Sequence, residues 1–546
     1  IMANWEKYLK NQVLRYYYST YRSGDTAFVK DESNFHLHQD SLWADILQRE
    51  YCKINHLLDY PGGFDTYIFG LYLNTLTANF DPHTNYFSLS DKELFESSIS
   101  RNKISFGADL DQNDEGEIVI SRLIPGGPAW RSGEINAGDV LLSIRFPEME
   151  IIDLVCSNLA EIQDLIYNSR ADHIEVTVRS GLGQVKTVEL KMESLAAAEN
   201  STYSFVLDGD HKIGYITLPG FYTEPDQNDP LGCASDLVKE IRRLKSDGVE
   251  GLILDLRNNG GGSIVEAVDL AGIFIDSGPL CIYRRSGDKT ALIKDLKKGT
   301  VYDGPLLLMI NGYSASAAEI LAGILRDYNR AVIFGTPSFG KASGQVIAPL
   351  TEPGQANSGL YLYNEDPSDY LKITTTRYYR LDGSSHQANG IIPDIQMPVH
   401  AGYAKIKESE FPSFLPNDTV RKPVTFEPFA PLPLDSLRSR SCDRVSKNDN
   451  FNAFKALNDS IRPLYTGRLS IPLDYNSFRS EYLRNRGFFN RIDSLEAIPD
   501  VHYTIRNNTH DMTMLKSDAY KSEIHNEIIE NLKGDFYLEE AYRVTG

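Results

Sequence analysis

The sequence predicts a multidomain α+β protein, in which an α/β core is preceded by a smaller β domain and flanked by helical regions at both ends. Three observations lead to this prediction. The chain has 546 residues, which corresponds to roughly three or four domains. Its hydrophobic fraction of 41% is that of a packed globular protein. The apolar pattern changes from helical to β-like near residue 98, and to alternating strands and helices near residue 196.

The composition excludes several classes of function. With 55 basic and 75 acidic residues the net charge is −20, and no basic patch is present, so we expect no nucleic-acid partner. The longest aliphatic run near the middle, residues 306–310, is far shorter than the roughly 20 residues that span a bilayer. Five scattered cysteines include no Cys-x-x-Cys pair, and we expect no metal site. The chain starts without a recognisable signal peptide, but Ile1 is not a natural first residue, which fits a trimmed export signal.

Residues 1–97 are predicted to be helical. Trp5, Leu9 and Val13 recur at four-residue spacing, as on one face of a helix. Further apolar stripes follow at residues 41–58 and 67–76. We therefore expect an N-terminal helical region.

Residues 98–195 are predicted to form a small β domain that resembles a PDZ domain. The resemblance depends on three motifs, Ser105-Phe106-Gly107-Ala108, Gly127-Pro128-Ala129 and Ala137-Gly138-Asp139. A PDZ domain adds a peptide C-terminus as a strand and captures its carboxylate with backbone N–H groups. We expect Phe106, Gly107 and Ala108 to form that turn, with Gly107 allowing close backbone approach. The alternative is a plain small β domain, because Gly-Pro and Gly-Asp turns are common.

Residues 196–400 are predicted to form an α/β core, because apolar strands alternate with helical patterns. The predicted strands are 212–218, 251–256, 305–310 and 331–334, the predicted helices are 231–245, 263–273 and 317–328, and a β-rich stretch, 370–380, closes the region. Residues 401–546 are predicted to form a proline-rich linker followed by a polar helical region.

Small residues follow one buried strand and open a helix, in the stretch Ser314-Ala315-Ser316-Ala317. Groups at a helix N-terminus lie at the positive end of its dipole. A serine there can attack a carbonyl while neighbouring N–H groups hold the oxyanion. The alternative is that the serine serves only as a helix cap.

A second candidate is Lys341, which follows a glycine-containing loop. Gly335, Gly340 and Lys341 match the first part of a P-loop, but Ala342 stands where a P-loop needs Ser or Thr, and a strand pattern follows. A lysine in an apolar cleft can instead lose its proton and act as general base to a serine. Its pKa must then fall from about 10.4 to roughly 7–8, which corresponds to about 4 kcal/mol and is within reach of burial.

A third candidate is the glycine loop after the strand that ends in Asp255-Leu256-Arg257. Asn258 and Asn259 lead into three consecutive glycines, residues 260–262. Consecutive glycines let backbone amides approach a ligand closely, which suits an oxyanion hole or an anion site. The alternative is a flexible loop.

Taken in order, these motifs resemble those of the tail-specific, or carboxyl-terminal processing, serine proteases. The match covers roughly residues 60–400, and the helical flanks are most similar to the larger, periplasmic branch. The motifs that carry the resemblance are Asp81-Pro82-His83-Thr84, the PDZ-like module, residues 255–262, residues 314–319, Phe339-Gly340-Lys341, residues 377–380 and residues 390–394.

The resemblance implies a crotonase-like ββα protease core with a Ser–Lys dyad. It assigns Ser316 as the nucleophile and Lys341 as the base, and 341 − 316 = 25 agrees with the family's spacing. It also implies that Gln345 orients the lysine, and that the backbone N–H groups of Gly262 and Ala317 form the oxyanion hole.

Two positions depart from the family's pattern. Ala318 stands where the family has serine, and the sequence from Lys341 to Gln345 is Lys-Ala-Ser-Gly-Gln rather than Lys-Gly-Thr-Val-Gln. Neither change removes a predicted catalytic group.

The resemblance therefore implies a serine endopeptidase that cleaves proteins recognised by their C-terminal tails. It implies no cofactor, a periplasmic or otherwise exported location, and as partners proteins or peptides with accessible C-termini and an adaptor protein. The implied division is an N-terminal helical region (1–97), a PDZ-like domain (98–195), the protease core (196–400), and a linker with a C-terminal helical region (401–546).

Three alternatives remain open from the sequence. The first is a non-catalytic PDZ peptide-binding scaffold with a decayed hydrolase core. The second is an acyl-CoA enzyme of the crotonase type, and the third is a hydrolase with a Ser-His-Asp triad that uses His83 or His386. A metal site at His36, His38 and Asp40 is not favoured, because no second cluster completes it.

Overall fold

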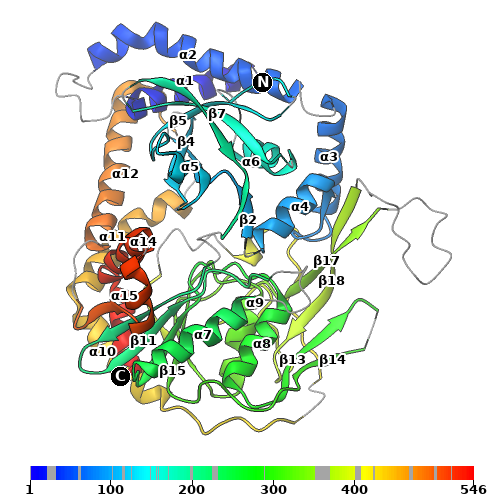
Figure 1. Ribbon diagram of the computed structural model, residues 1–546, viewed down its shortest axis with the longest axis vertical. Coiled ribbons are helices and arrows are strands. Elements are labelled where there is room, and N and C mark those ends of the chain that lie inside the picture. The colour runs from blue at the N-terminus through cyan, green and yellow to red at the C-terminus, as the bar shows by residue number, and fades with distance from the viewer. Residues whose placement is uncertain are drawn as a thin grey trace, which may run out of the picture. The chain divides into compact units, whose positions relative to one another are not determined.

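The computed structural model places the chain in two compact units (Figure 1). One unit comprises residues 1–72, 103–195 and 467–489, and the other comprises residues 73–102, 196–466 and 490–546. The four-part division predicted from the sequence stays a prediction. The structure describes residues 2–20, 32–58, 63–100, 102–113, 117–124, 126–147, 149–154, 157, 159–169, 171–181, 183–196, 201–223, 232–287, 289–350, 369–399, 407–421, 425–466, 471–496, 501–517 and 519–546. Leu231 and residues 401–406, where a predicted helix and the predicted linker begin, lie outside these ranges.

The first unit contains a cluster of long helices. They are α1 (Met2–Thr20), α2 (Glu32–Leu58) and α12 (Tyr475–Glu496). Leu9 and Val13, two of the residues whose spacing predicted a helix, are buried between them, whereas Trp5 is 40% exposed. Burial of an apolar stripe is what stabilises such amphipathic helices.

The first unit also holds a β domain built on one antiparallel sheet with the strand order β3-β4-β5-β7-β8, while β6 pairs with β5. In β7 every second side chain is buried, as expected for a sheet with one face on the core. The elements are β2 (Asn102–Ser105), β3 (Ala108–Gln112), β4 (Ile118–Leu123), α5 (Pro128–Ser132), β5 (Val140–Arg145), β6 (Ile152–Asp153), α6 (Leu159–Asn168), β7 (His173–Arg179), β8 (Val185–Lys191) and β9 (Glu193–Ala196).

The second unit is built on a seven-stranded sheet with the order β19-β16-β15-β12-β11-β10-β20. Strands β11, β12, β15, β16 and β19 run parallel, and β10 and β20 are antiparallel to their neighbours. The strands are β10 (Tyr203–Asp208), β11 (Lys212–Thr217), β12 (Gly251–Asp255), β15 (Leu306–Ile310), β16 (Val332–Gly335), β19 (Ile395–Gln396) and β20 (Thr504–Asn507).

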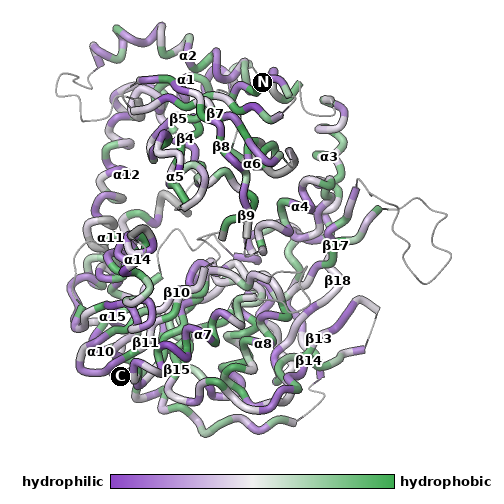
Figure 2. Tube along the Cα trace, in the orientation of Figure 1, coloured by the Kyte–Doolittle hydropathy of each residue, from purple (hydrophilic) through white to green (hydrophobic). Residues whose placement is uncertain are grey.

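Both faces of this sheet are covered, which explains why its central strands are continuously apolar. Alternate residues of β15 belong to two different cores: Leu308 packs with α7, α8 and α9, and Met309 packs with α11, α14 and α15. Among these helices, α8 is one of the more hydrophobic parts of the tube in Figure 2. The helices are α7 (Cys233–Ser246), α8 (Ile264–Phe274), α9 (Ala317–Asp327), α10 (Leu434–Lys447), α11 (Asp449–Thr466), α14 (Ala519–Lys533) and α15 (Phe536–Thr545).

A second, antiparallel sheet has the order β1-β18-β13-β14, and β17 also pairs with β18. Its strand β1 lies within the region that the sequence predicted to be helical. The prediction missed this strand because its pairing partner, β18, is nearly 300 residues away. The strands are β1 (Asn85–Ser88), β13 (Gly278–Arg285), β14 (Ala291–Asp295), β17 (Ser343–Pro349) and β18 (Asp369–Tyr379). The remaining elements are α3 (Phe64–Thr77), α4 (Leu89–Ser98), α13 (Thr509–Met514) and the 3-10 helices η3 (Glu408–Glu410) and η4 (Leu515–Ser517).

Parallel strands place the loops that follow them at one edge of a sheet. The loops after β11, β12, β15 and β16 therefore gather at the carboxyl edge of the large sheet, where α/β proteins usually bind ligands. Among the described helices, none combines the length and the apolar character needed to cross a membrane.

Candidate active site

Polar side chains tie the loops after β12 and β15 to each other. Asn258 donates its backbone N–H to Oδ1 of Asn311 at 3.0 Å, and Nδ2 of Asn311 donates to Oδ1 of Asn258 at 2.8 Å. Asn259 is fully buried and bonds to the carbonyl of Leu218 at 2.8 Å and to the N–H of Gly261 at 2.9 Å. These hydrogen bonds hold the glycine loop, residues 258–262, against the serine loop, residues 311–316.

The two serines of the serine loop lie in different environments. Ser314 is fully buried, and its hydroxyl donates to the carbonyl of Leu256 at 2.7 Å and accepts the N–H of Asn311 at 2.9 Å. Ser316 is only half-buried and precedes α9 with φ 55° and ψ −114°. A positive φ is uncommon outside glycine and costs of order 1–3 kcal/mol, which the surrounding contacts must offset. Ser314 is thus a structural residue, and Ser316 is the accessible one.

Glu319, in the first turn of α9, connects Ser316 with the loop after β16. Its carboxylate accepts hydrogen bonds from the hydroxyl of Ser338 at 2.5 Å and from the backbone N–H groups of Gly340 at 2.7 Å, Lys341 at 2.8 Å and Ser316 at 2.9 Å. Burial raises the pKa of Glu319 to about 7, and these donors oppose that rise. Because Oε2 binds both N–H groups, the backbone nitrogens of Ser316 and Lys341 lie within roughly 6 Å of each other.

The amine of Lys341 has two acceptors and a depressed affinity for its third proton. Its Nζ donates to Oε1 of Gln345 at 2.8 Å and to the backbone carbonyl of Ser343 at 3.0 Å. Burial lowers the pKa of Lys341 to about 8, and the charge of Lys372 acts in the same direction, while Glu408 opposes it. The pKa lies in the range that a general base needs.

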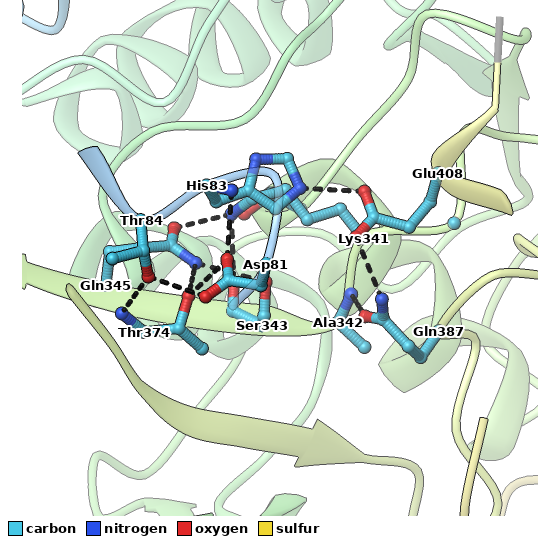
Figure 3. A network of polar contacts seen from close by, with 12 residues as sticks. Asp81, His83, Thr84, Lys341, Ala342, Ser343, Gln345, Thr374, Gln387 and Glu408 are labelled. Carbon is cyan, nitrogen blue, oxygen red and sulfur yellow. Dashed lines mark hydrogen bonds and ion pairs between the residues drawn. The ribbon is translucent and has the colours of Figure 1, made fainter. Parts of the chain in front are cut away.

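The amide of Gln345 is held by a side chain of the neighbouring strand, which is held in turn by one from the loop before β1 (Figure 3). Gln345 and Thr374 are cross-strand neighbours in the β17–β18 pair. Nε2 of Gln345 donates to Oγ1 of Thr374 at 2.9 Å and to Oγ of Ser343 at 3.1 Å. Oγ1 of Thr374 in turn donates to Oδ1 of Asp81 at 2.9 Å.

The other side of Lys341 is lined by a second chain of polar contacts, also seen in Figure 3. Glu408 is completely buried, with its Oε2 2.7 Å from Nε2 of His83 and its Oε1 accepting Nε2 of Gln387 at 2.9 Å. Oε1 of Gln387 accepts the backbone N–H of Ala342 at 2.7 Å. A residue after the predicted core, Glu408, is therefore part of the lysine's surroundings.

Gly262, predicted to be an oxyanion donor, has a backbone that only glycine adopts easily. Its φ is 136°, and a Cβ there would lie 2.4 Å from the carbonyl oxygen of Phe221. The backbone of Phe221 bonds to the two residues that flank Gly262. Its carbonyl accepts the N–H of Ser263 at 2.8 Å, and its N–H donates to the carbonyl of Gly261 at 2.9 Å. In a parallel bridge of this kind, the N–H of Gly262 points away from Phe221.

The glycine loop packs directly against the serine. A Cβ on Gly261 would lie 2.8 Å from Cβ of Ser316 and 3.1 Å from the nitrogen of Ala317. Within the described residues, the N–H groups of Gly262 and Ala317 have no hydrogen-bond acceptor. Both are therefore available to a group bound beside Ser316.

The competing sites suggested by the sequence differ from this arrangement. His386 is buried, with Nε2 3.2 Å from the carbonyl of Lys341, and burial lowers its pKa to about 4, so it is neutral near pH 7. His83 faces Glu408. The strand β17 follows Lys341, whereas a P-loop leads into a helix. The described residues contain no cluster of three or more His, Cys, Asp or Glu side chains arranged for a metal ion.

The predicted carboxylate-binding turn of the β domain lies just before β3. Phe106 is buried, and its carbonyl accepts the N–H of Ala129 at 2.9 Å. Gly107 has φ 91°, donates its N–H to Oγ of Ser105 at 3.0 Å, and would place a Cβ 2.8 Å from the nitrogen of Pro128. Ala108 begins β3. Close packing against the helix α5 thus accounts for the glycine.

Several residues of this site were not assigned a role from the sequence. Glu319 and Asp81 stood within recognised motifs, and their position near Ser316 and Lys341 is set by tertiary contacts. Thr374 lies in an alternating β pattern without a motif, and Glu408 lies past the predicted end of the core. No local signal marks either residue, because each contacts the site only after distant segments have paired.

Comparison with known proteins agrees with this architecture. Residues 212–397 match the model for peptidase family S41, and residues 96–145 match the model for the PDZ domain. A tail-specific protease of Haemophilus influenzae is 31% identical over 330 residues, which are 60% of this chain and 45% of the relative, so the chain spans less than half of that protein. A solved structure of a photosystem II D1 C-terminal processing protease is 20% identical, covers 74% of this chain and 99% of that one, and has a TM-score of 0.36.

A second curated relative is matched over most of its length. The carboxy-terminal-processing protease of Bartonella bacilliformis is 30% identical over 325 residues, which are 59% of this chain and 68% of the relative. The sequence therefore identified the family correctly, and the chain belongs to the carboxy-terminal-processing proteases of peptidase family S41.

Proposed function

We propose that the chain is a serine endopeptidase that cleaves proteins recognised by their C-terminal tails. In this proposal Ser316 is the nucleophile, Lys341 is the general base, and Gln345 orients the lysine. The N–H groups of Gly262 and Ala317 form the oxyanion hole.

The observation that carries the proposal is the hydrogen bonding of the lysine amine. A neutral amine has two N–H hydrogens and one lone pair. Two acceptors, Oε1 of Gln345 and the carbonyl of Ser343, lie at 2.8 Å and 3.0 Å from Nζ of Lys341. When both hydrogens are donated, the lone pair is left for a third group. The pKa of Lys341, about 8, makes the neutral amine accessible near neutral pH.

The proposed reaction passes through an acyl-enzyme. Lys341 removes the proton of Ser316 as the serine oxygen attacks the scissile carbonyl carbon, and the carbonyl oxygen becomes an oxyanion held by two N–H groups. The tetrahedral intermediate expels the amine, which takes the proton from Lys341. Water then attacks the acyl-enzyme, with Lys341 again as the base, and releases the new C-terminus.

The β domain supports recognition of a C-terminal tail. Strand β3 lies at one end of the strand order in the described sheet, and α6 packs beside it. An edge strand next to a helix lets an extended peptide add as a further strand. In the proposal the tail binds there, and its binding energy positions the rest of the chain for cleavage.

An exported location also belongs to the proposal. Cys52 is disulfide-bonded, whereas Cys233, Cys281 and Cys442 are free thiols. Disulfides persist in oxidising compartments such as the bacterial periplasm. The presence of one supports export of this chain.

The test is proteolysis of an unfolded protein that ends in an apolar tail, by the wild type and by Ser316→Ala and Lys341→Ala. We expect cleavage by the wild type alone, and slower cleavage of a twin substrate whose C-terminus is amidated. Cleavage by either variant at the wild-type rate contradicts the dyad. Tail binding without any cleavage by the wild type indicates a non-catalytic scaffold instead.

A further inference from the structure

A carboxylate from the beginning of the second unit lies at the far end of a hydrogen-bond chain that starts at Lys341 (Figure 3). Lys341 donates to Oε1 of Gln345, Nε2 of Gln345 donates to Oγ1 of Thr374, and Oγ1 of Thr374 donates to Oδ1 of Asp81, with distances of 2.8, 2.9 and 2.9 Å. Asp81 is only 4% exposed. The chain of contacts runs from the proposed base to a buried acid that does not touch it.

We propose that Asp81 and Thr374 are positioning residues that fix which end of the Gln345 amide faces Lys341. The proposal rests on the function proposed above. It assigns to the motif Asp81-Pro82-His83-Thr84 a role in directing the lysine lone pair toward Ser316.

The direction of the chain is set by its end. A carboxylate accepts hydrogen bonds and has none to give. Thr374 must therefore use its one hydroxyl hydrogen on Asp81, which leaves its oxygen lone pairs facing Gln345. Only the NH₂ end of the Gln345 amide can donate to those lone pairs, so the amide oxygen is turned toward Lys341.

The remaining neighbours of Asp81 are also donors. The backbone N–H of His83 donates to Oδ1 at 2.9 Å. Oγ1 of Thr84 accepts the backbone N–H of Thr374 at 3.2 Å and donates its own hydrogen to Oδ2 of Asp81 at 2.5 Å. In each of these hydrogen bonds Asp81 is therefore the acceptor. None of them gives Asp81 a hydrogen that it could donate to Thr374.

A reversed amide would impair the base. With Gln345 rotated by half a turn, its NH₂ group would face Nζ of Lys341. The lone pair of the neutral amine would then accept a hydrogen from Gln345 instead of taking the proton of Ser316. The orientation of one amide therefore separates a competent base from an occupied one.

The electrostatic effect of Asp81 has the opposite sign, which makes the proposal testable. Among the described residues, the charged groups with the largest effect on Lys341 are Glu408, Glu319 and Asp81, which favour its protonated form, and Lys372, which disfavours it. Removing the charge of Asp81 would by itself lower the pKa of Lys341 and increase the neutral fraction near pH 7. A loss of activity on removing that charge must then come from positioning.

The first experiment compares Thr374→Val with Thr374→Ser in the full chain. Valine keeps the shape but has no hydroxyl, and serine keeps the hydroxyl. We expect Thr374→Val to lower kcat by about 10- to 100-fold with KM changed less than about twofold, and Thr374→Ser to retain at least about a third of the wild-type kcat. Thr375→Val, the next residue of β18, is the matched control and should stay near the wild type.

The second experiment uses Asp81→Asn, whose side-chain amide can donate a hydrogen to Thr374 and so permit the reversed arrangement. We expect kcat to fall by about 10-fold or more, while the acid limb of kcat/KM moves to lower pH. The rate of covalent labelling of Ser316 by a small fluorophosphonate should fall in parallel, because labelling requires no tail binding.

The outcomes separate this inference from the proposed function. Equal kcat for Thr374→Val and Thr374→Ser, or a gain of activity at pH 7 in Asp81→Asn, overturns the inference while the wild type and Ser316→Ala still differ. Cleavage that survives in Ser316→Ala overturns the proposed function itself. Should Thr374→Val not fold, as judged by its thermal transition, Asp81→Asn decides the question alone.

Discussion

The surroundings of Ser316 and of Lys341 are assembled in different ways. The loop of Ser316 is held by the loop after the adjacent strand, as in the bond from Ser314 to Leu256, which joins residues 58 positions apart. The surroundings of Lys341 include the bond from Thr374 to Asp81, which spans 293 positions, and the contact of His83 with Glu408, which spans 325. The proposed nucleophile is placed by the topology of one sheet, whereas the proposed base is surrounded by side chains from the beginning of the second unit and from segments about 300 residues later.

The loop of Ser316 and the surroundings of Lys341 depend on different properties of the fold. Placing a loop at the edge of a parallel sheet requires only the order of neighbouring strands. Lowering the pKa of a lysine and orienting its lone pair requires burial, charges and hydrogen-bond polarity together. We therefore expect substitutions near Ser316 to act mainly through geometry, and substitutions around Lys341 to show themselves in pH dependence.

The largest effect is expected where the two serines are exchanged for alanine one at a time. Ser316→Ala removes the proposed nucleophile and should lower proteolysis by more than about 1,000-fold, with little change in the free energy of unfolding. Ser314→Ala leaves the carbonyl of Leu256 and the N–H of Asn311 without their buried partner, which should cost about 1–3 kcal/mol of stability.

Activity assays below the unfolding transition and chemical denaturation of both variants check this pair. Retained proteolysis in Ser316→Ala together with complete loss in a well-folded Ser314→Ala would reverse the assignment of the two serines.

The next effect concerns the glycine loop. In Gly262→Ala a Cβ would meet the carbonyl of Phe221 at 2.4 Å, so the loop must shift and carry its N–H away from the proposed oxyanion hole. Loss of one oxyanion donor costs about 100- to 1,000-fold in kcat, and we expect a fall of that order with KM largely kept. Gly260→Ala is the matched control, because nothing lies within 4 Å of its added Cβ. Steady-state kinetics that find the two variants equally active would contradict the role of Gly262.

Four parallel strands and three helices of the core were predicted with small errors, because their signals are local, whereas β10 of the same sheet was not predicted. Apolar runs bounded by glycine or polar residues marked β12 and β15, and the predicted strand 251–256 is observed as Gly251–Asp255. The accessible serine could not be separated from Ser314 by composition alone, and it was the family's motif that assigned Ser316. The backbone of Ser316, at φ 55°, depends on contacts that no local pattern reveals.

The parts that the sequence left unassigned are the long-range ones. Strand β1 pairs with β18, and this pairing brings Thr84 to Thr374. Glu408 is a charged residue in a stretch that the sequence predicted to be a linker, and charged residues are seldom fully buried unless they are paired. Partners separated by about 300 residues leave no periodic signal, so the polar network around Lys341 required the structure.

A stability measurement can test the environment of Lys341 without any substrate. Its pKa is lowered from 10.5 to about 8 on folding, so between these pH values the unfolded chain binds a proton that the folded chain does not. Stability of the wild type should therefore rise, relative to Lys341→Met, as pH increases from 8 to 10.5, by up to about 3 kcal/mol. Below pH 8 the difference between the two proteins should be constant.

Denaturant titrations of both proteins at pH 7, 8, 9 and 10 measure this difference, and the constant effect of lost hydrogen bonds cancels in the comparison. Curves that stay parallel across the whole range would show that the lysine keeps its ordinary pKa in the folded protein.

The smallest effect is expected from a second lysine that faces the same region. The pKa of Lys372 is lowered by burial, and its Nζ lies 5.0 Å from the ring centroids of both Phe87 and Phe95. As a like charge it helps to keep Lys341 neutral. In Lys372→Met the pKa of Lys341 should rise, and the acid limb of kcat/KM, expected near pH 8 in the wild type, should move to higher pH by less than about one unit.

The matched control is Lys294→Met, which removes an exposed lysine from β14 of the same sheet. It changes the net charge equally but not the field at Lys341, since exposed charges are screened by solvent and salt. The same shift in both variants would mean that a general charge effect sets the pKa of Lys341, and a shift toward lower pH in Lys372→Met would contradict the contribution of its charge. A shift confined to Lys372→Met would show that the charge of Lys372 acts on Lys341 directly. Strand β18, which also carries Thr374, would then affect both the pKa of Lys341 and, through Gln345, its orientation.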